Sequence, residues 1–147
     1  MGLDYYIDHG YTLDYWIQQW WQELGKPIYI AETDLAGGHC NHDIQQQIKW
    51  LRDTIKDCRN ASEQGIPMRG YCLYPTVTDN LYWGSNQVHQ YKCGFGDGYW
   101  GDNAGSLFRF RPDVDGTYQR VPVPEMITAF SEEVEALRVW EQTRKTR

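Results

Sequence analysis

Carboxylate and aromatic side chains lie at the ends of three apolar segments in this 147-residue sequence. They are Asp4 and Tyr6 in the first segment, Glu32 at the end of the second, and Tyr74, Asp79, Asn80 and Trp83 at or after the end of the third. A carboxylate that ends an apolar strand is costly to bury unless it is paired or used. Glu32 is therefore the strongest candidate for a catalytic group. The alternative is an acid that caps a helix or forms a salt bridge.

The three apolar segments predict strands. They are Leu3–Ile7, which is rich in aromatic and β-branched residues, and Pro27–Glu32 and Met68–Tyr74, each of which begins at or after a proline. In the second strand, alternation puts Ile28, Ile30 and Glu32 on one face. Its nearly continuous apolar run is typical of a parallel sheet buried on both faces.

Helices are predicted between and after these strands. Apolar residues recur at helical spacing after Thr12, and Gly25 ends that pattern. Asn41 or Asp43 can cap a second helix, and Pro124 can begin a third. The order of elements is therefore β-α-β-α-β-loop-α, which indicates an α/β fold.

A long segment rich in Gly, Asp, Asn and aromatic residues covers 76–105, and we expect it to be a loop. Leu107–Phe110 can form a short edge strand that turns at 113–116. We expect residues 1–138 to form one domain and residues 139–147 to form a polar tail.

Composition excludes several classes of protein. The chain is 41% hydrophobic and 23% charged, and no window approaches the roughly 20 apolar residues that a membrane-spanning helix needs. Its formal net charge of −6 argues against a nucleic-acid partner, because phosphate binding needs clustered Lys and Arg. Aromatic residues make up 15% of the chain, more than a core of this size requires. A surface lined with aromatic residues suits a ligand that has both apolar faces and hydroxyl groups.

Two architectures fit the β-α order. A doubly wound sheet that binds a nucleotide would need a Gly-rich turn after the first strand, whereas residues 8–12 contain one glycine. The other architecture is part of a (β/α)8 barrel, whose chemistry lies at the carboxyl ends of its strands.

Four motifs, in order, resemble clan A glycoside hydrolases, especially family 1 β-glucosidases. Residues 2–6 (GLDYY) are similar to the sixth strand and residues 25–34 (GKPIYIAETD) to the seventh, which leads into the catalytic Glu. Residues 65–74 (GIPMRGYCLY), followed by 79–83 (DNLYW), look like the eighth strand. The late hairpin is paralleled by residues 107–110 (LFRF) and 118–122 (YQRVP).

This resemblance implies that the chain is the C-terminal portion of a TIM barrel, equivalent to strands six to eight and their helices. It further implies a retaining β-glycosidase with Glu32 as the nucleophile and Tyr6 as the hydrogen-bond donor that orients it. The sugar would be held by the other residues of the strand-end loops: Asp4, Tyr74, Asp79, Asn80, Trp83, His39 and Trp100.

A retaining glycosidase needs a second carboxylate, which in this clan follows an Asn at the end of the fourth strand. The sequence contains no Asn-Glu pair, so we expect the acid/base half of the barrel to be absent and the isolated chain to be inactive. Its expected partners are a carbohydrate and either an N-terminal barrel half or further copies of itself. The alternative is a non-catalytic carbohydrate-binding or structural remnant.

No cofactor or metal is expected. The spacing of His39, Cys40 and His42 matches no standard structural metal site. The four cysteines have no compact disulfide pattern, which favours reduced thiols, although a bridge between Cys40 and Cys93 remains open. No secretory signal is visible, so we expect a cytoplasmic protein.

Overall fold

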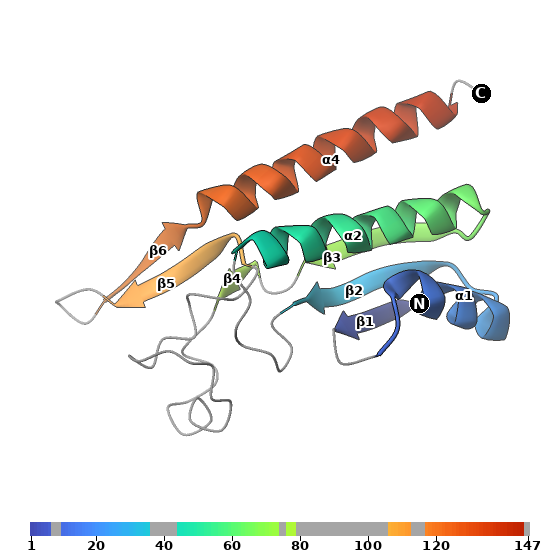
Figure 1. The fold of residues 1–147 in the computed structure, drawn as a ribbon, viewed down its shortest axis with the longest axis horizontal. Coiled ribbons are helices and arrows are strands. Elements are labelled where there is room, and N and C mark those ends of the chain that lie inside the picture. Colours follow the sequence, from blue (N-terminus) through green and yellow to red (C-terminus); the bar gives the residue numbers. More distant parts are fainter. Residues whose placement is uncertain (7–9, 36–43, 74–75, 79–105, 113–116, 146–147) are drawn as a thin grey trace.

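The computed structural model describes residues 1–6, 10–35, 44–73, 76–78, 106–112 and 117–145. Its centre is a three-stranded parallel sheet in the order β1-β2-β3, formed by β1 (Gly2–Tyr6), β2 (Ile28–Asp34) and β3 (Met68–Leu73) (Figure 1). Helix α1 (Leu13–Leu24) joins β1 to β2, and helix α2 (Ile44–Glu63) joins β2 to β3. The predicted βα order is therefore confirmed.

A second sheet lies beyond the carboxyl ends of the first (Figure 1). It contains β4 (Val77–Thr78), β5 (Phe108–Pro112) and β6 (Tyr118–Pro122), with β4 parallel to β5 and β5 antiparallel to β6. The sequence prediction placed β4 inside a loop. That part of the prediction is wrong, because the Thr76 carbonyl accepts hydrogen bonds from the amides of Leu107 and Phe108 and holds the short strand against β5.

Local signals set the helix ends. The Thr12 hydroxyl accepts a hydrogen bond from the Tyr15 amide at 3.3 Å and caps α1, while Gly25 ends it in the left-handed conformation at φ 57°. Helix α4 begins at Pro124 and ends at Lys145, so it continues past the predicted domain boundary at residue 138. The predicted caps Asn41 and Asp43 lie outside the described residues.

The helices cover one face of the β1-β2-β3 sheet. The core lies between the helices and this face, and between neighbouring helices. One cluster of buried residues joins α1 to the sheet through Leu13, Ile17, Ile28 and Ile30. A second cluster joins α2 to α4 and includes Ile48, Leu51, Ile55, Val123, Met126 and Ala129. Helix α2 therefore contacts both neighbouring helices and is the middle of the helical layer (Figure 1).

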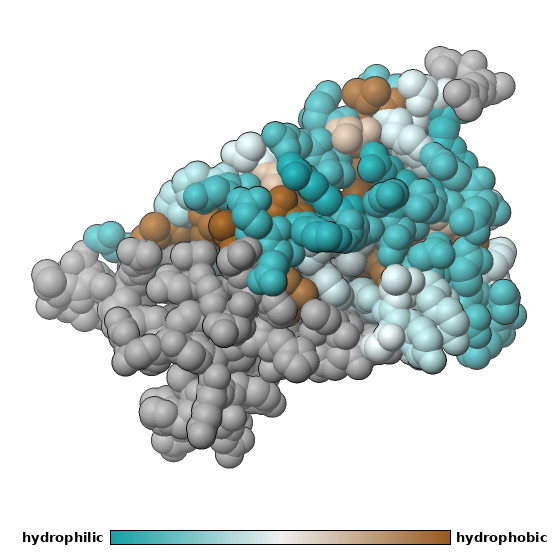
Figure 2. Space-filling view, viewed as in Figure 1, coloured by the Kyte–Doolittle hydropathy of each residue, from teal (hydrophilic) through white to brown (hydrophobic). Residues whose placement is uncertain are grey.

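The outer surface of this helical layer is mainly hydrophilic, and hydrophobic residues gather where α4 begins beside β6 (Figure 2). Ion pairs from Arg52 to Glu132, at 2.8 Å, and from Arg52 to Glu133, at 3.8 Å, link the exposed sides of α2 and α4. Among the described residues, no helix has the length and apolar character needed to cross a membrane.

Candidate functional site

Strand β2 contains a β-bulge directly before Glu32. Leu3 pairs with Ile30, but the next pair is Asp4 with Glu32, so β2 has one extra residue at this point. The same extra residue appears against β3, where Ile30 pairs with Tyr71 and Thr33 with Leu73. A bulge of this kind changes the direction in which the following side chains point.

The bulge reverses the faces of β2. Ile28 and Ile30 are buried before it, and Thr33 and Leu35 are buried after it. Glu32 is therefore on the face opposite to Ile28 and Ile30, and the prediction that these three residues share one face is wrong. The reason is that strict alternation holds only in a strand without an inserted residue.

The face that Glu32 joins is not covered by α1, α2 or α4, and we refer to it as the open face. Register and exposure assign six residues to it: Gly2 and Asp4 on β1, Tyr29 and Glu32 on β2, and Gly70 and Cys72 on β3. Tyr29 is 41% exposed, so the prediction that the second strand is buried on both faces is also wrong. The apolar run of β2 reflects burial on one face only.

Tyr29 lies over Gly2 on the neighbouring strand. A Cβ atom added to Gly2 would be 2.5 Å from the Tyr29 hydroxyl oxygen. Glycine thus leaves room for the aromatic ring to cross the base of the open face. Sequence reasoning did not select Tyr29 or Cys72 as site residues. Their place in the alternation of β2 and β3, relative to the buried residues, is the signal that would have found them.

Glu32 is half-buried at the carboxyl end of β2, and its register partner Asp4 is exposed. Burial raises the pKa of the Glu32 carboxyl above its usual value, and the Asp4 carboxylate raises that pKa further. Both effects favour the protonated form. The structure therefore brings together two of the predicted site residues and couples their charges.

The opposite face supports this end of β2. The indole N–H of Trp50 on α2 donates to the Thr33 hydroxyl at 3.2 Å, and the Trp50 ring stacks on Tyr5 with centroids 5.2 Å apart. The Tyr5 hydroxyl in turn donates to the Tyr11 carbonyl at 2.7 Å. These contacts fix the backbone of β1 and β2 from behind while leaving Asp4 and Glu32 accessible from the open face.

A second acid lies between the helices. The Asp57 carboxylate accepts a hydrogen bond from the Asp14 amide at 3.2 Å, in the first turn of α1. Burial raises the pKa of Asp57, and this hydrogen bond opposes the rise. Burial also raises the pKa of the neighbouring Cys58 thiol to about 12. Asp57 caps the start of α1, and the Cys58 thiol remains protonated. Both residues are structural and lie outside the candidate site.

Several predicted site residues cannot be placed. Tyr6 belongs to β1 and pairs with Asp34, but the side chains of both lie outside the description. Six further residues lie in segments that are not described: Tyr74, Asp79, Asn80, Trp83, His39 and Trp100. The part of the chain that the structure describes contains no group of three His, Cys, Asp or Glu residues able to hold a metal ion.

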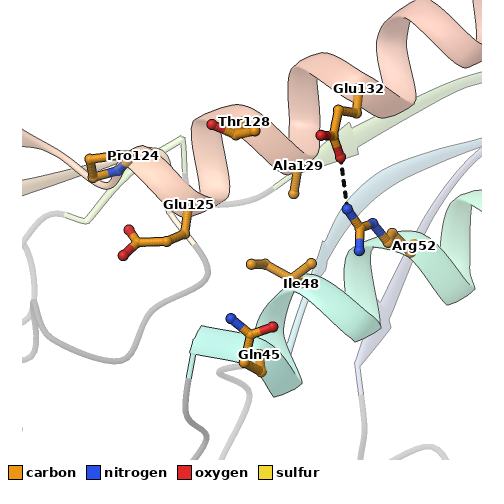
Figure 3. Close-up of a pocket in the computed structure, with 8 residues that line it drawn as sticks. All are labelled: Gln45, Ile48, Arg52, Pro124, Glu125, Thr128, Ala129 and Glu132. Atoms are coloured by element: carbon orange, nitrogen blue, oxygen red, sulfur yellow. Dashed lines mark hydrogen bonds and ion pairs between the residues drawn. The ribbon is translucent and has the colours of Figure 1, made fainter.

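A surface pocket of about 410 Å³ lies elsewhere, between α2 and α4. Figure 3 shows Ile48 and Ala129 facing each other across it, with the Arg52 to Glu132 ion pair at one side. None of the predicted site residues lines this pocket. It is a groove in the helical layer, on the side of α2 where α4 packs, and not on the open face.

The fold is similar to that of several β-glycosidases. The chain superposes on β-glycosidase BGL167 with a TM-score of 0.56 and 17% identity, over 84% of this chain and 24% of that one. The β-glycosidase of the hyperthermophile Thermosphaera aggregans gives 0.55 and 11%, over 83% and 21%. The GH1 β-glucosidase of Exiguobacterium antarcticum B7 gives 0.50 and 17%, over 84% and 25%.

These similarities confirm the resemblance in fold to β-glucosidase-like glycoside hydrolases. No protein-family model matches the sequence, and none of the curated proteins matches it. The chain spans about a quarter of the length of the β-glycosidases to which it is similar.

Proposed function

We propose that this chain is the C-terminal portion of the (β/α)8 barrel of a retaining β-glycosidase, with Glu32 as its nucleophile. The observation that carries the proposal is the position of Glu32. It lies two residues before the carboxyl end of the parallel strand β2, and a bulge turns it from the helix-covered face to the open face. In (β/α)8 enzymes the strand ends carry the catalytic groups, and the helices lie on the outside of the barrel. The open face of this sheet would be the inside of the closed barrel.

In the proposed reaction the ionised Glu32 carboxylate attacks the anomeric carbon of a β-glycoside. The bond from that carbon to the leaving-group oxygen breaks, a second carboxylic acid protonates the oxygen, and a glycosyl-enzyme forms. Water then attacks the same carbon, the second carboxylate takes its proton, and Glu32 is released. Tyr6 would donate a hydrogen bond to Glu32 and favour its ionised form.

The remaining predicted residues would bind the sugar. Asp4 is the register partner of Glu32 and would accept hydrogen bonds from sugar hydroxyl groups. The other six would contribute from the strand-end loops, the aromatic residues by stacking on the C–H faces of the ring: Tyr74, Asp79, Asn80, Trp83, His39 and Trp100.

The second carboxylate would come from further strands of the barrel. Strand β1 has a neighbour on one side only within the described sheet, so its other edge can accept a parallel strand. Helix α1, which follows β1, carries the stacked rings of Trp16 and Trp20, and the 60% exposed Tyr11 before the helix packs edge-on against Trp16. This aromatic side of α1 suits the helix that would accompany such a strand. Self-association through the same edge is the competing arrangement.

Mechanism-based labelling tests the assignment. A 2-fluoro-glycoside with a good leaving group should attach to Glu32 when the chain is assembled with the rest of the barrel, and peptide mass spectrometry would locate the label. Glu32→Gln should abolish the labelling. Glu125→Gln, on exposed helix α4, is the matched control and should not change it. Hydrolysis with the label on another carboxylate would disprove the role of Glu32.

A non-catalytic carbohydrate-binding role is the second candidate. It is favoured by the 41% exposed ring of Tyr29, which lies on the open face together with Asp4 and Glu32. Aromatic rings beside hydrogen-bonding groups suit sugar binding without any chemistry. This role predicts that glycosides perturb the NMR signals of Tyr29 in the isolated chain, and that neither the chain nor its assembly hydrolyses them.

A further inference from the structure

We propose that Asp4 is a positioning residue for Glu32, and that the two carboxyl groups form one electrostatically coupled pair in which the charge of Asp4 opposes the ionisation of Glu32. The catalytic consequence rests on the proposed function. The pairing itself does not, because it follows from the register of β1 and β2.

Geometry brings the two groups together. Asp4 and Glu32 are direct register partners on adjacent parallel strands, and neighbouring strands lie about 4.8 Å apart. Asp4 is exposed, whereas its neighbours Leu3 and Tyr5 are half-buried and buried. Alternation along β1 therefore places the Asp4 side chain on the open face. The bulge in β2 turns Glu32 to that same face. Without the inserted residue, the sheet would separate the two carboxyl groups.

Electrostatics then couples them. Two carboxylates that share a site resist ionising together, so one of them holds a proton to a higher pH. Burial raises the pKa of the Glu32 carboxyl, with a further contribution from the Asp4 carboxylate. Glu32 is half-buried and Asp4 is exposed, so Glu32 is the partner that retains the proton.

The other ionisable side chains on the elements around Glu32 lie farther from it in register than Asp4 does or are on the opposite face. On β3, Tyr71 pairs with Ile30 and Leu73 pairs with Thr33. Cys72 lies between them and is the residue of β3 with an ionisable side chain nearest in register to Glu32. Arg69 lies at the start of β3, at the other end of the sheet. Helix α2 packs on the opposite face, where it presents the neutral indole of Trp50 to Thr33.

Tyr29 precedes Glu32 on β2 and carries no carboxyl group. Tyr6 and Asp34 pair at the next register position, and their side chains are not described. Asp4 is therefore the described acid that faces Glu32 directly.

The pair makes a specific prediction about pH. Glu32 attacks a sugar only when it is ionised, so a raised pKa moves the acidic limit of activity upward. Asp4→Asn retains the shape of the side chain and removes its charge. The pKa of Glu32 should then fall, and the acidic limit should move to lower pH.

The test is an NMR titration of the side-chain carboxyl carbons in the full chain, with the Glu32 signal assigned through Glu32→Gln. In the wild type, the Glu32 midpoint should lie above the ordinary value for a Glu carboxyl. The Glu32 midpoint should move to lower pH in Asp4→Asn and remain close to the wild-type value in Asp4→Glu. The matched control is Asp53→Asn, an exposed acid on α2 that pairs with Lys49, and it should leave the Glu32 midpoint unchanged.

A Glu32 midpoint that is the same in the wild type and in Asp4→Asn would overturn the proposal. Folding of each variant is checked by tryptophan fluorescence, and the raised Glu32 midpoint in the wild type provides a second test that needs no substitution. If the midpoint moves but Glu32 is never labelled by a fluoro-glycoside in the assembled barrel, the pairing stands and the proposed glycosidase function fails. The two failures are therefore distinguishable.

Discussion

The two faces of the β1-β2-β3 sheet differ in what their residues do. On the helix-covered face, Ile28, Ile30 and Thr33 have no exposed surface. On the open face, Asp4 is exposed and Glu32 half-buried, and Tyr29 retains 41% of its surface. Burial of apolar area stabilises the first face, whereas the second keeps charged groups where a ligand can reach them. The fold is thus held by one face, and the other face is left open.

The largest expected effect tests the covered face. Leu51→Ala, at a fully buried position on α2, should lower the free energy of unfolding by about 2–5 kcal/mol, because it removes apolar contacts and leaves a cavity. Tyr29→Ala on the open face should cost about 1 kcal/mol or less, since the ring is already partly in water. Urea unfolding of both variants measures the difference. Equal losses would contradict the distinction between the two faces.

The part-buried hydrogen bond behind Glu32, from Trp50 to Thr33, comes next. Thr33→Val keeps the shape of the side chain but leaves the Trp50 indole N–H without its acceptor, at an expected cost of about 1–3 kcal/mol. Tyr29→Phe, which also removes one hydroxyl but on the open face, should change stability by less than about 0.5 kcal/mol. Chemical unfolding followed by tryptophan fluorescence compares them, and a Thr33→Val variant as stable as the wild type would exclude a role for this bond.

A smaller, pH-dependent effect concerns Asp57. Burial raises its pKa in the folded state above the unfolded value of about 3.9, so folding takes up a proton between these two values. The stabilisation is fully present below the unfolded pKa and is lost as pH rises through the folded pKa. Asp57→Asn keeps an acceptor for the Asp14 amide and removes this dependence.

The stability of Asp57→Asn relative to the wild type should therefore increase from about pH 4 toward neutrality. Unfolding free energies measured across this range provide the comparison. Glu23→Gln, at an exposed position on α1, should show no such trend. Parallel pH profiles for the wild type and Asp57→Asn would show that burial does not perturb this acid.

The smallest effect is expected at Gly2. The Cβ of Gly2→Ala would meet the far end of the Tyr29 side chain, which can move into the open space, so the cost should be below about 0.5 kcal/mol. Gly25→Ala meets no atom, but its φ of 57° should cost about 1 kcal/mol. Thermal unfolding ranks the two variants. A larger loss in Gly2→Ala would mean that the Tyr29 ring is held rigidly in place.

Much of the fold was predictable from local chemistry. The Thr12 cap, the left-handed Gly25 and the initial Pro124 each act through their own backbone neighbours, so the sequence locates these helix ends correctly. Strand β4 was missed because two residues, Val77 and Thr78, are too few to show a period. That strand exists only because Thr76 meets Leu107 and Phe108 across a long separation in sequence.

The sequence selects Glu32 as the candidate, but it does not give the geometry around that residue. Glu32 stands out because it is a carboxylate at the end of an apolar strand. Its face was predicted incorrectly, because the bulge is visible only when β2 is paired with β1 and β3. The partnership between Asp4 and Glu32 depends on that same pairing, and so does the place of Tyr29 and Cys72 on the open face.

The sequence by itself determined the three strands of the parallel sheet, where α1 begins and ends, where α4 begins, and which carboxylate is the candidate for chemistry. Propensity, capping and apolar spacing are local properties, and each of them is written in neighbouring residues. The tertiary structure alone decided the register, the bulge and therefore the face of Glu32. The reason is that one inserted residue reverses every side chain after it, and only the paired strands reveal where that residue is.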